Sequence, residues 1–374
     1  MNMGANKKLK TLLVQLAAGT CISIFTGFIL QRSAPVVPQQ ENSGLKDYYG
    51  SYFPIGVAVS AKSLDGAEAV LIRKQFNSVT PENAMKMAVI HPLENQYFWK
   101  DADYIVNFAK EHGMKVRGHN LCWHEQVPDW MFKDKQGRRV TKKVLLGRLK
   151  SHIFTVVKRY QGSVYAWDVV NEAIGDDQHT FLRNSSWYQI CGEDFIFKAF
   201  EYAHQADPKA QLFYNDYNTE RPEKRDRIYK LLKKMKAAHI PVDGIGLQGH
   251  WSLFEPDTKD LKDAIEKYAS LGLKVQITEM DISVYPWEKE KRALHPGENT
   301  NYTSIMEQKQ SDKYAEIFKV LRDERGVITG VTFWNVSDRH TWLDEYPVQG
   351  RKNYPLLFDQ QLQPKQAYYR VVKF

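Results

Sequence analysis

Short apolar runs alternate along the chain with segments whose apolar residues recur about every 3.6 positions. Eight of these runs have the length and the Val, Ile and Phe content of buried strands. The predicted strands are Phe53–Ser60, Phe76–Thr80, Lys115–Asn120, Tyr165–Val170, Leu212–Asn215, Gly244–Gln248, Lys274–Thr278 and Ile328–Trp334. Between them, segments such as Lys143–Tyr160 place most of their apolar residues on one side of a helix. This alternation is typical of parallel strands joined by crossover helices.

Eight such repeats predict a single (β/α)8 TIM barrel, of the α/β class, over residues 47–374. A doubly wound open sheet is the alternative, but no glycine-rich phosphate loop follows the first strand to support it. The polar segment Tyr285–Gln310, which contains Pro286, Pro296 and Gly297, is predicted to be a large loop.

The first 46 residues differ from the rest of the chain. A basic stretch, Lys7–Lys10, precedes the uncharged run Thr11–Leu30, and this order is typical of an export signal. Residues 1–30 therefore predict export and a secreted protein. Because the run is about as long as a membrane-spanning helix, membrane anchoring by residues 11–30, or a lipoprotein signal at Cys21, is the alternative. Residues 31–46 are rich in Pro, Gln, Ser and Gly and are predicted to be a flexible linker.

Composition and charge exclude several partners. The net charge of +8 comes partly from the N-terminal segment, and no block of like charge follows it, so no nucleic-acid partner is predicted. None of Cys21, Cys122 and Cys191 belongs to a CxxC pair, which argues against a metal cluster or a redox motif. We expect no cofactor, no metal and a monomer.

Two glutamates, Glu172 and Glu279, each end an apolar run that predicts a buried strand. The carboxyl ends of barrel strands face one shared pocket, so these two carboxylates are expected to meet. Such a pair suits cleavage of a glycosidic bond, where one carboxyl group donates a proton and the other acts as nucleophile.

Other polar and aromatic residues follow the same strand ends. Asp281 and His250 are expected to orient Glu279 and keep it charged, whereas Asp168 is expected to hold its strand end or a neighbouring histidine. A metal site at His119 and His250 is disfavoured because no third His or Cys joins them at ligand spacing. The residues expected to bind substrate are Glu82, Asn83, Lys86, His119, Trp123, Asn171, Tyr217, Gln248, His250, Trp334 and Trp342.

Several of these segments resemble glycoside hydrolase family 10, in order along residues 50–372. The matching motifs are Thr80–Lys86, Arg117–His124, Trp167–Glu172, Asn215–Asn218, Gly246–His250, Ile277–Ile282 and Gly350–Tyr369. The resemblance implies a barrel enzyme that hydrolyses internal β-1,4-xylosidic bonds of xylan or xylo-oligosaccharides with retention of configuration. It implies Glu172 as the acid/base and Glu279 as the nucleophile.

Three alternatives remain beside that reading. The first is a related retaining β-1,4-glycanase, or an aryl-glycosidase that acts on short oligosaccharides. The second is a non-catalytic carbohydrate-binding barrel, which the presence of both glutamates disfavours. The third is a metal-dependent hydrolase, which a chelator would inactivate.

Overall fold

A computed structural model describes residues 43–374. The predicted export signal or anchor, and the linker up to residue 42, lie outside the described residues. The helices are α1 (Leu45–Tyr48), α2 (Gly66–Gln75), α3 (Met87–Ile90), α4 (Lys100–Glu111), α5 (Lys142–Arg159), α6 (Ser186–Cys191), α7 (Asp194–Ala206), α8 (Pro222–Ala237), α9 (Thr258–Ala269), α10 (Ser304–Asp323) and α11 (Gln366–Val372). The strands are β1 (Ile55–Val59), β2 (Ser78–Pro81), β3 (Lys115–His119), β4 (Val164–Asn171), β5 (Gln211–Asp216), β6 (Gly244–Leu247), β7 (His250–Ser252), β8 (Lys274–Ser283), β9 (Arg292–Ala293), β10 (Ile328–Phe333) and β11 (Val348–Gln349).

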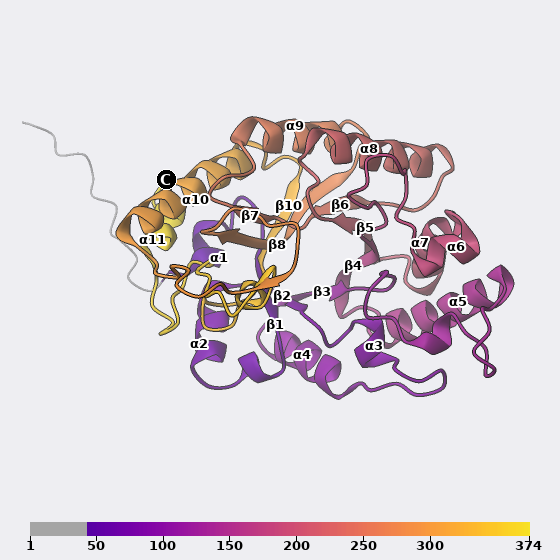
Figure 1. Cartoon of the computed structure of the whole chain (residues 1–374). Coiled ribbons are helices and arrows are strands. Elements are labelled where there is room, and N and C mark those ends of the chain that lie inside the picture. Colours follow the sequence, from indigo (N-terminus) through magenta and orange to yellow (C-terminus); the bar gives the residue numbers. More distant parts are fainter. Residues whose placement is uncertain (1–42) are drawn as a thin grey trace, which may run out of the picture. The chain divides into compact units, whose positions relative to one another are not determined.

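Eight parallel strands form a closed barrel in the order β1, β2, β3, β4, β5, β6, β8, β10. The barrel closes where Ile55 of β1 lies beside Val331 of β10, and β10 also pairs with β8. Helices surround these strands, with α8 and α9 on one side and α4 on the other (Figure 1). The predicted single (β/α)8 TIM barrel is therefore confirmed.

The helices pack on the barrel through the apolar positions that predicted them. In α8, the side chains of Ile228, Leu231, Leu232 and Met235 are fully buried. In α5, which matches the predicted segment Lys143–Tyr160 to within a residue at each end, the buried residues include Leu145, Leu149, Ile153, Val156 and Val157. Burial of one apolar face on each helix supplies the hydrophobic stabilisation of the barrel.

Strand β8 is longer than its sequence pattern predicted. It continues to Ser283, beyond the predicted end at Thr278, and the extension pairs with the short strand β7, which was not predicted. In that pairing, His250 lies opposite Asp281. The extra strand therefore places a histidine next to a carboxylate at the mouth of the barrel.

The prediction of one loop over Tyr285–Gln310 was wrong at its end. Helix α10 begins at Ser304, and the side chain of Thr303 caps it by accepting from the N–H of Met306. The connection before α10 contains strand β9, which pairs with β11 from a later part of the chain. Arg292 binds the carboxylates of both Glu288 and Glu298, at 2.6 and 2.9 Å. The polar composition of this segment did not predict its strand, because ion pairs rather than apolar contacts hold the segment in place.

The folded domain begins slightly before the predicted boundary. Leu45 is fully buried, and its N–H donates to Oε1 of Gln75, the last residue of α2. The hydroxyl of Tyr49 donates to the carbonyl of Val371 at 2.7 Å. Gln75 ends α2 and lies just before β2 begins, so it marks the amino-terminal end of that strand. Helix α1, which binds Gln75 through Leu45, therefore lies at the amino-terminal end of the barrel strands. Residues 44–46 therefore belong to the barrel domain rather than to the linker.

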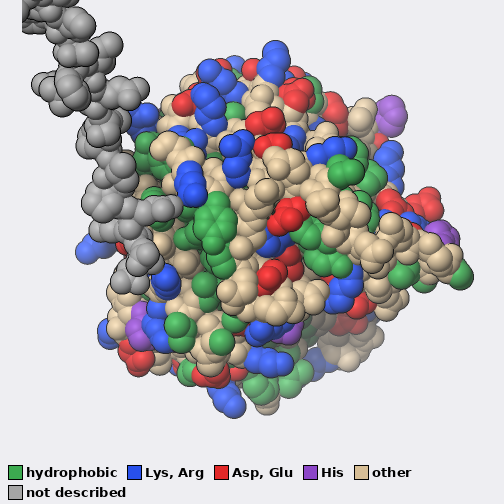
Figure 2. Space-filling model, turned by 90° about the vertical axis from the view of Figure 1, so that its left-hand side faces the viewer, with side chains coloured by type: hydrophobic (Ala, Val, Ile, Leu, Met, Phe, Trp, Pro, Cys, Tyr) green, Lys and Arg blue, Asp and Glu red, His purple; other side chains and the backbone are tan. Residues whose placement is uncertain are grey.

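Acidic and basic side chains are interspersed on the surface. On the face shown in Figure 2, neither sign forms one continuous patch, in keeping with a sequence that contains no block of like charge. Within residues 43–374, no helix combines the length and the apolar character needed to cross a bilayer.

Candidate active site

The two predicted glutamates lie at the carboxyl-end face of the barrel, next to β4 and within β8, which are separated by β5 and β6. Glu172 directly follows β4, and Glu279 lies within β8. Asn215 at the end of β5 donates through Nδ2 to Oε1 of Glu279 at 2.7 Å and to Oδ1 of Asn171 at 2.8 Å. Asn171 in turn donates to Oε1 of Glu172 at 3.1 Å. Two amide side chains therefore connect the two carboxylates.

Glu279 is held between two histidines. Nε2 of His250 lies 3.2 Å from Oε2 of Glu279, and Nδ1 of His119 lies 3.9 Å from Oε1. The Glu279 side chain is only about 6% exposed. Burial by itself would raise the pKa of Glu279, but the two histidines and the Asn215 amide outweigh it and lower that pKa to about 2. Glu279 is therefore a carboxylate at any ordinary working pH.

His250 is stabilised as a cation by the carboxylates on either side. Its Nδ1 lies 3.0 Å from Oδ2 of Asp281, which also accepts from Nε1 of Trp342 at 2.8 Å. Burial opposes the charged form, but Asp281 and Glu279 overcome it and raise the pKa of His250 to about 10. The arrangement brings together the residues predicted to orient Glu279.

Glu172 accepts hydrogen bonds from neutral side chains, and Nδ1 of His124 lies 3.8 Å from its Oε2. Oε2 accepts from Nε1 of Trp123 at 2.9 Å, and Oε1 accepts from Nε2 of Gln248 at 2.9 Å as well as from Asn171. The side chain is about 13% exposed. Its backbone has a φ of +56°, a conformation uncommon outside glycine, and its N–H donates to the carbonyl of Asn215. Glu172 thus leaves the strand direction while its backbone stays tied to β5.

Asp168 lies below the site, inside the barrel. Arg117 donates through Nη1 and Nη2 to the two carboxylate oxygens of Asp168. Oδ2 of Asp168 also accepts from Nδ1 of His119 at 2.9 Å. Both Arg117 and Asp168 are almost completely buried. Asp168 therefore fixes the ring of His119, which faces Glu279, and has no contact with Glu279 among the described interactions.

The predicted sugar-binding residues Asn83 and Lys86 line the β2 side of the site. Nζ of Lys86 donates to Oδ1 of Asn83 at 2.9 Å and lies 5.1 Å from the ring centre of Trp123. Burial lowers the pKa of Lys86, and the negative charges of Glu279 and Glu82 act in the opposite direction. This side of the site therefore presents several closely spaced donors and acceptors.

Two tryptophans form walls on the other side. Trp334 packs edge-on against the rings of His119 and His250, with centroids 5.3 and 6.1 Å apart. Trp342 lies 4.8 Å from the His250 ring and is stacked with Tyr346. Aromatic walls beside polar groups suit a ligand such as a sugar, which has apolar C–H faces and polar hydroxyls.

Tyr217 lies on the Glu172 side of the site. Its hydroxyl accepts from Nη2 of Arg183 and donates to Oδ2 of Asp176, and Nζ of Lys224 lies 3.3 Å from its ring centre. Nε of Arg183 also donates to the carbonyl oxygen of Glu172 at 3.0 Å. These contacts fix the Tyr217 ring beside the proposed acid.

Several site residues were not among the predicted set. Asn215 was recognised as a strand end but given no role, although it is the group that joins the two glutamates. Arg117 and Arg183 were missed, because their importance depends on partners far along the chain. Among residues 43–374, no group of three or more His, Cys, Asp or Glu side chains is arranged to hold a metal ion.

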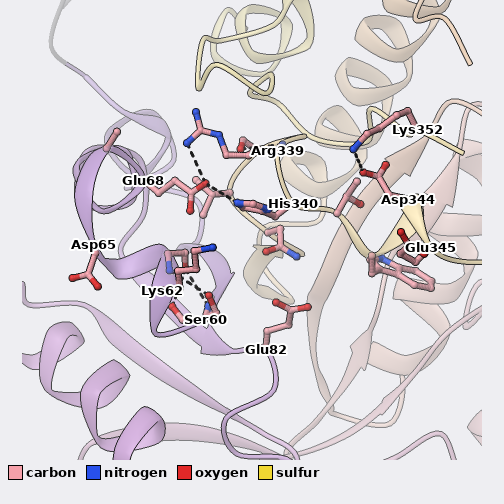
Figure 3. Close-up of a pocket in the computed structure, with 17 residues that line it drawn as sticks. Ser60, Lys62, Asp65, Glu68, Glu82, Arg339, His340, Asp344, Glu345 and Lys352 are labelled. Carbon is pink, nitrogen blue, oxygen red and sulfur yellow. Dashed lines mark hydrogen bonds and ion pairs between the residues drawn. The ribbon is translucent and has the colours of Figure 1, made fainter. Parts of the chain in front are cut away.

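A cavity of about 670 Å³ adjoins this site (Figure 3). Glu82 and Trp342 line it, together with residues of the β1–α2 connection and of the segment that follows β10. Neither Glu172 nor Glu279 lines it.

Known proteins resemble this chain along nearly the whole described part. A "Beta-1,4-xylanase" from Dictyoglomus thermophilum is 50% identical over 337 residues, which cover 89% of this chain and 92% of that protein. An "Endo-1,4-beta-xylanase" from Geobacillus stearothermophilus is 48% identical, covering 88% of this chain and 97% of that protein. The crystal structure of the endo-1,4-beta-xylanase from Caldicellulosiruptor owensensis superposes with a TM-score of 0.85 at 46% identity, covering 89% of this chain and all of that one.

The family model described as "Glycosyl hydrolase family 10" matches residues 44–374, which include both glutamates and every other predicted site residue. With the (β/α)8 barrel and the extensive identity to known relatives, this match shows that the chain belongs to glycosyl hydrolase family 10.

Proposed function

We propose that the protein hydrolyses internal β-1,4-xylosidic bonds in xylan, with retention of configuration, using Glu279 as nucleophile and Glu172 as acid/base. The observation that carries this assignment is the difference in surroundings. Two histidines lie beside Glu279, and the pKa of that carboxyl group is lowered to about 2. The hydrogen bonds to Glu172 come from neutral side chains, and Nδ1 of His124 lies 3.8 Å from its Oε2. A nucleophilic carboxylate must be ionised before reaction, and Glu279 meets that requirement.

In the first step, Glu279 attacks the anomeric carbon while the bond to the leaving oxygen breaks. Glu172, protonated at this stage, gives its proton to that oxygen, so the leaving chain departs as a neutral alcohol. The product is a sugar esterified to Glu279, and Glu172 is left as a carboxylate.

In the second step, a water molecule attacks the same carbon from the side that the leaving chain vacated. Glu172 now accepts a proton from that water, and the bond to Glu279 breaks to restore the carboxylate. Two inversions give overall retention. Both glutamates end the cycle in their starting states, so no cofactor is consumed.

The amide pair supports both steps. Asn215 donates to Glu279 and Asn171 donates to Glu172, so a fixed amide orients each carboxylate. Fixed donors cost no reorganisation during the reaction, which is the general advantage of a preorganised site.

The choice of xylan as substrate rests on the names of the relatives. Proteins 50% and 48% identical to this chain are described as xylanases, and coverage of those proteins exceeds nine-tenths. This favours xylan over the broader alternative of another β-1,4-glycan or an aryl glycoside.

The test compares initial rates of reducing-sugar release from xylan, carboxymethylcellulose and an aryl β-xyloside, together with the viscosity of the xylan solution. We expect the highest rate on xylan and an early fall in viscosity, since internal cuts shorten chains fastest. Proton NMR during hydrolysis should show the β-anomer first. Preference for the cellulose derivative, or first appearance of the α-anomer, would contradict the proposal.

We further propose that the protein is exported, because a basic stretch at residues 7–10 precedes an uncharged, mostly apolar run at residues 11–30. Expression of the full chain in a bacterium with a secretory pathway, followed by mass measurement of the protein in medium and membranes, tests this. A mature protein of reduced mass in the medium indicates cleavage, whereas full-length protein in membranes indicates an anchor. Full-length protein in the cytoplasm contradicts both.

A further inference from the structure

Gln276 lies inside the barrel and takes no part in the steps proposed for the two glutamates. It belongs to β8, three residues before Glu279, and it is only about 2% exposed. Its Oε1 accepts from Nε of Arg117, in β3, at 2.9 Å. Because β4, β5 and β6 lie between β3 and β8 in the barrel order, this hydrogen bond crosses the interior of the barrel.

The nitrogen of the Gln276 amide is bonded as well. Nε2 donates to Oγ1 of Thr329, in β10, at 3.3 Å, and Tyr165 of β4 also hydrogen-bonds with this side chain. A buried amide with partners at both its oxygen and its nitrogen is held in one orientation. Gln276 therefore presents its oxygen to Arg117 in a fixed direction.

This acceptor completes the set of partners of the Arg117 guanidinium. Nε binds Gln276, whereas Nη1 and Nη2 bind the two carboxylate oxygens of Asp168. A guanidinium group is rigid and planar, so a partner at Nε restricts the direction in which the other two nitrogens point. Gln276 therefore holds Arg117 in the orientation that binds both oxygens of Asp168.

The contacts continue from Asp168 to the proposed nucleophile. Oδ2 of Asp168 accepts from Nδ1 of His119 at 2.9 Å, and the same nitrogen lies 3.9 Å from Oε1 of Glu279. Burial raises the pKa of Glu279, and the charge of His119 is the largest of the effects that lower it. The position of His119 therefore determines how strongly Glu279 is kept ionised.

Other charged groups also act on Glu279. His250 lies 3.2 Å from its Oε2, Lys86 and Arg117 act from farther away, and Glu172 is linked to it through two amides. Among the described interactions, Arg117 is the member of this set that binds Gln276. A change at Gln276 therefore reaches Glu279 through Arg117.

We propose that Gln276 is a positioning residue for the reaction, which holds His119 against Glu279 through Arg117 and Asp168. The proposal rests on the proposed function, since it takes Glu279 as the nucleophile. Loss of the Gln276 oxygen leaves Nε of Arg117 without its acceptor inside the barrel. The guanidinium then shifts, and Asp168 and His119 shift with it.

The test uses Gln276→Leu, which removes both polar groups at similar volume. With 2,4-dinitrophenyl β-xylobioside, the acidic limb of the kcat/KM profile should move to higher pH by about one unit, the low end of the effect of a neighbouring opposite charge. The plateau value of kcat/KM should fall by about tenfold, because the nucleophile is less well oriented. Since this leaving group needs little protonation, both changes report Glu279 rather than Glu172.

Thr329→Val is the matched control. It removes the other partner of Gln276 and keeps the contact with Arg117, so the acidic limb and kcat/KM should stay unchanged. An unmoved limb in Gln276→Leu would overturn the proposal. An equal shift in Thr329→Val would also overturn it, because any loosening of the barrel interior would then have the same effect.

A second variant covers the case in which Gln276→Leu does not fold. Gln276→Met keeps the length of the side chain and a sulfur that accepts hydrogen bonds weakly. It should move the acidic limb in the same direction by a smaller amount. An unmoved limb in a folded Gln276→Met protein would overturn the proposal.

An NMR measurement tests the same role without catalysis. The proton on Nδ1 of His119, which is bonded to Asp168, should give a downfield signal in the unchanged protein and in Thr329→Val. In Gln276→Leu this signal should move upfield or disappear through exchange with water, and an identical signal would overturn the proposal. If the unchanged protein cleaves no xyloside, the proposed function fails, and the NMR comparison alone decides whether Gln276 positions His119.

Discussion

Nε2 of His250 lies 3.2 Å from Oε2 of Glu279, and the pKa of each group is displaced toward its charged form. This pair explains how a buried carboxylate stays ionised at the mouth of the barrel. It also distinguishes the two glutamates chemically, because no comparable cation donates to Glu172 among the described hydrogen bonds.

The first prediction concerns Glu279→Ala. Loss of the proposed nucleophile should lower xylan hydrolysis by about 10³-fold or more. Added azide should restore turnover of an activated aryl xylobioside, because the small anion enters the vacated space and attacks from that face. The product should be the α-glycosyl azide, identified by NMR. A β-azide, or full activity without azide, would exclude Glu279 as nucleophile.

The second prediction concerns Glu172→Ala. Xylan hydrolysis should fall by about 10² to 10⁴, the usual contribution of general acid–base catalysis. A dinitrophenyl xylobioside needs little protonation of its leaving group, so formation of the glycosyl-enzyme should be affected far less. Azide should give the β-azide here, since it replaces the second-step water. Equal losses on both substrates would contradict the acid role.

The third prediction concerns the pH dependence of activity. In Asp281→Asn, the neutral amide no longer stabilises charged His250, so the pKa of His250 falls from about 10 and that of Glu279 rises from about 2. The acidic limb of the kcat/KM profile, measured between pH 3 and 9 on p-nitrophenyl β-xylobioside, should therefore move to higher pH. Asp263→Asn, on the surface of α9, should leave the profile unchanged. An unmoved limb in Asp281→Asn would show that Asp281 does not act through His250.

Glu279 and His250 make the stability depend on pH in opposite directions. Because the pKa of Glu279 is lowered by folding, its contribution is present above pH 4.5 and is lost as the pH falls toward about 2. The pKa of His250 is raised, so its contribution is full below pH 6.5 and is lost as the pH rises through about 10. Urea unfolding of the Asp281→Asn variant should show a weaker loss of stability between pH 6.5 and 10.

The fourth prediction concerns the buried pair of Arg117 and Asp168. Asp168→Asn leaves the Arg117 charge without its partner inside the barrel and should lower the free energy of unfolding by about 3 to 5 kcal/mol. Asp263→Asn breaks a solvent-exposed pair with Lys259 and should leave the free energy of unfolding almost unchanged. Urea denaturation followed by tryptophan fluorescence measures both. Equal effects would show that Arg117 is stabilised by other groups.

The fifth prediction concerns Gly246 in β6. A Cβ atom there would lie 2.2 Å from Oδ1 of Asn215, so Gly246→Ala should displace the amide that donates to Glu279. The expected loss in kcat is about 10- to 100-fold, the effect of losing a hydrogen bond to a charged group. At Gly330 in β10, the nearest atom would lie 3.4 Å away, so Gly330→Ala should retain most activity. Comparable losses in both would contradict this role of Asn215.

The barrel and its strand ends could be predicted from the sequence because both depend on local pattern. A buried parallel strand is a short apolar run, and the polar residue that follows it points to the shared face. Gln248 therefore contacts Glu172, and Trp334 contacts His250, at the face expected from the sequence, although the sequence could not show these contacts.

Features that depend on distant partners could not be predicted. Strand β7 is only three residues long, and it exists because β8 extends far enough to pair with it. The role of Arg117 could not be predicted because its partner, Asp168, lies 51 positions away in the sequence and meets it only inside the folded barrel. The cavity lined by Glu82 and Trp342 likewise requires the β1–α2 connection and the segment after β10 to meet.

The hydrogen bond from Leu45 to Gln75 fixes the position of α1 on the barrel. Helix α1 lies at the amino-terminal end of the strands, and the proposed catalytic groups lie at the carboxyl end. The start of the described chain and the proposed catalytic groups therefore lie at opposite poles of the barrel.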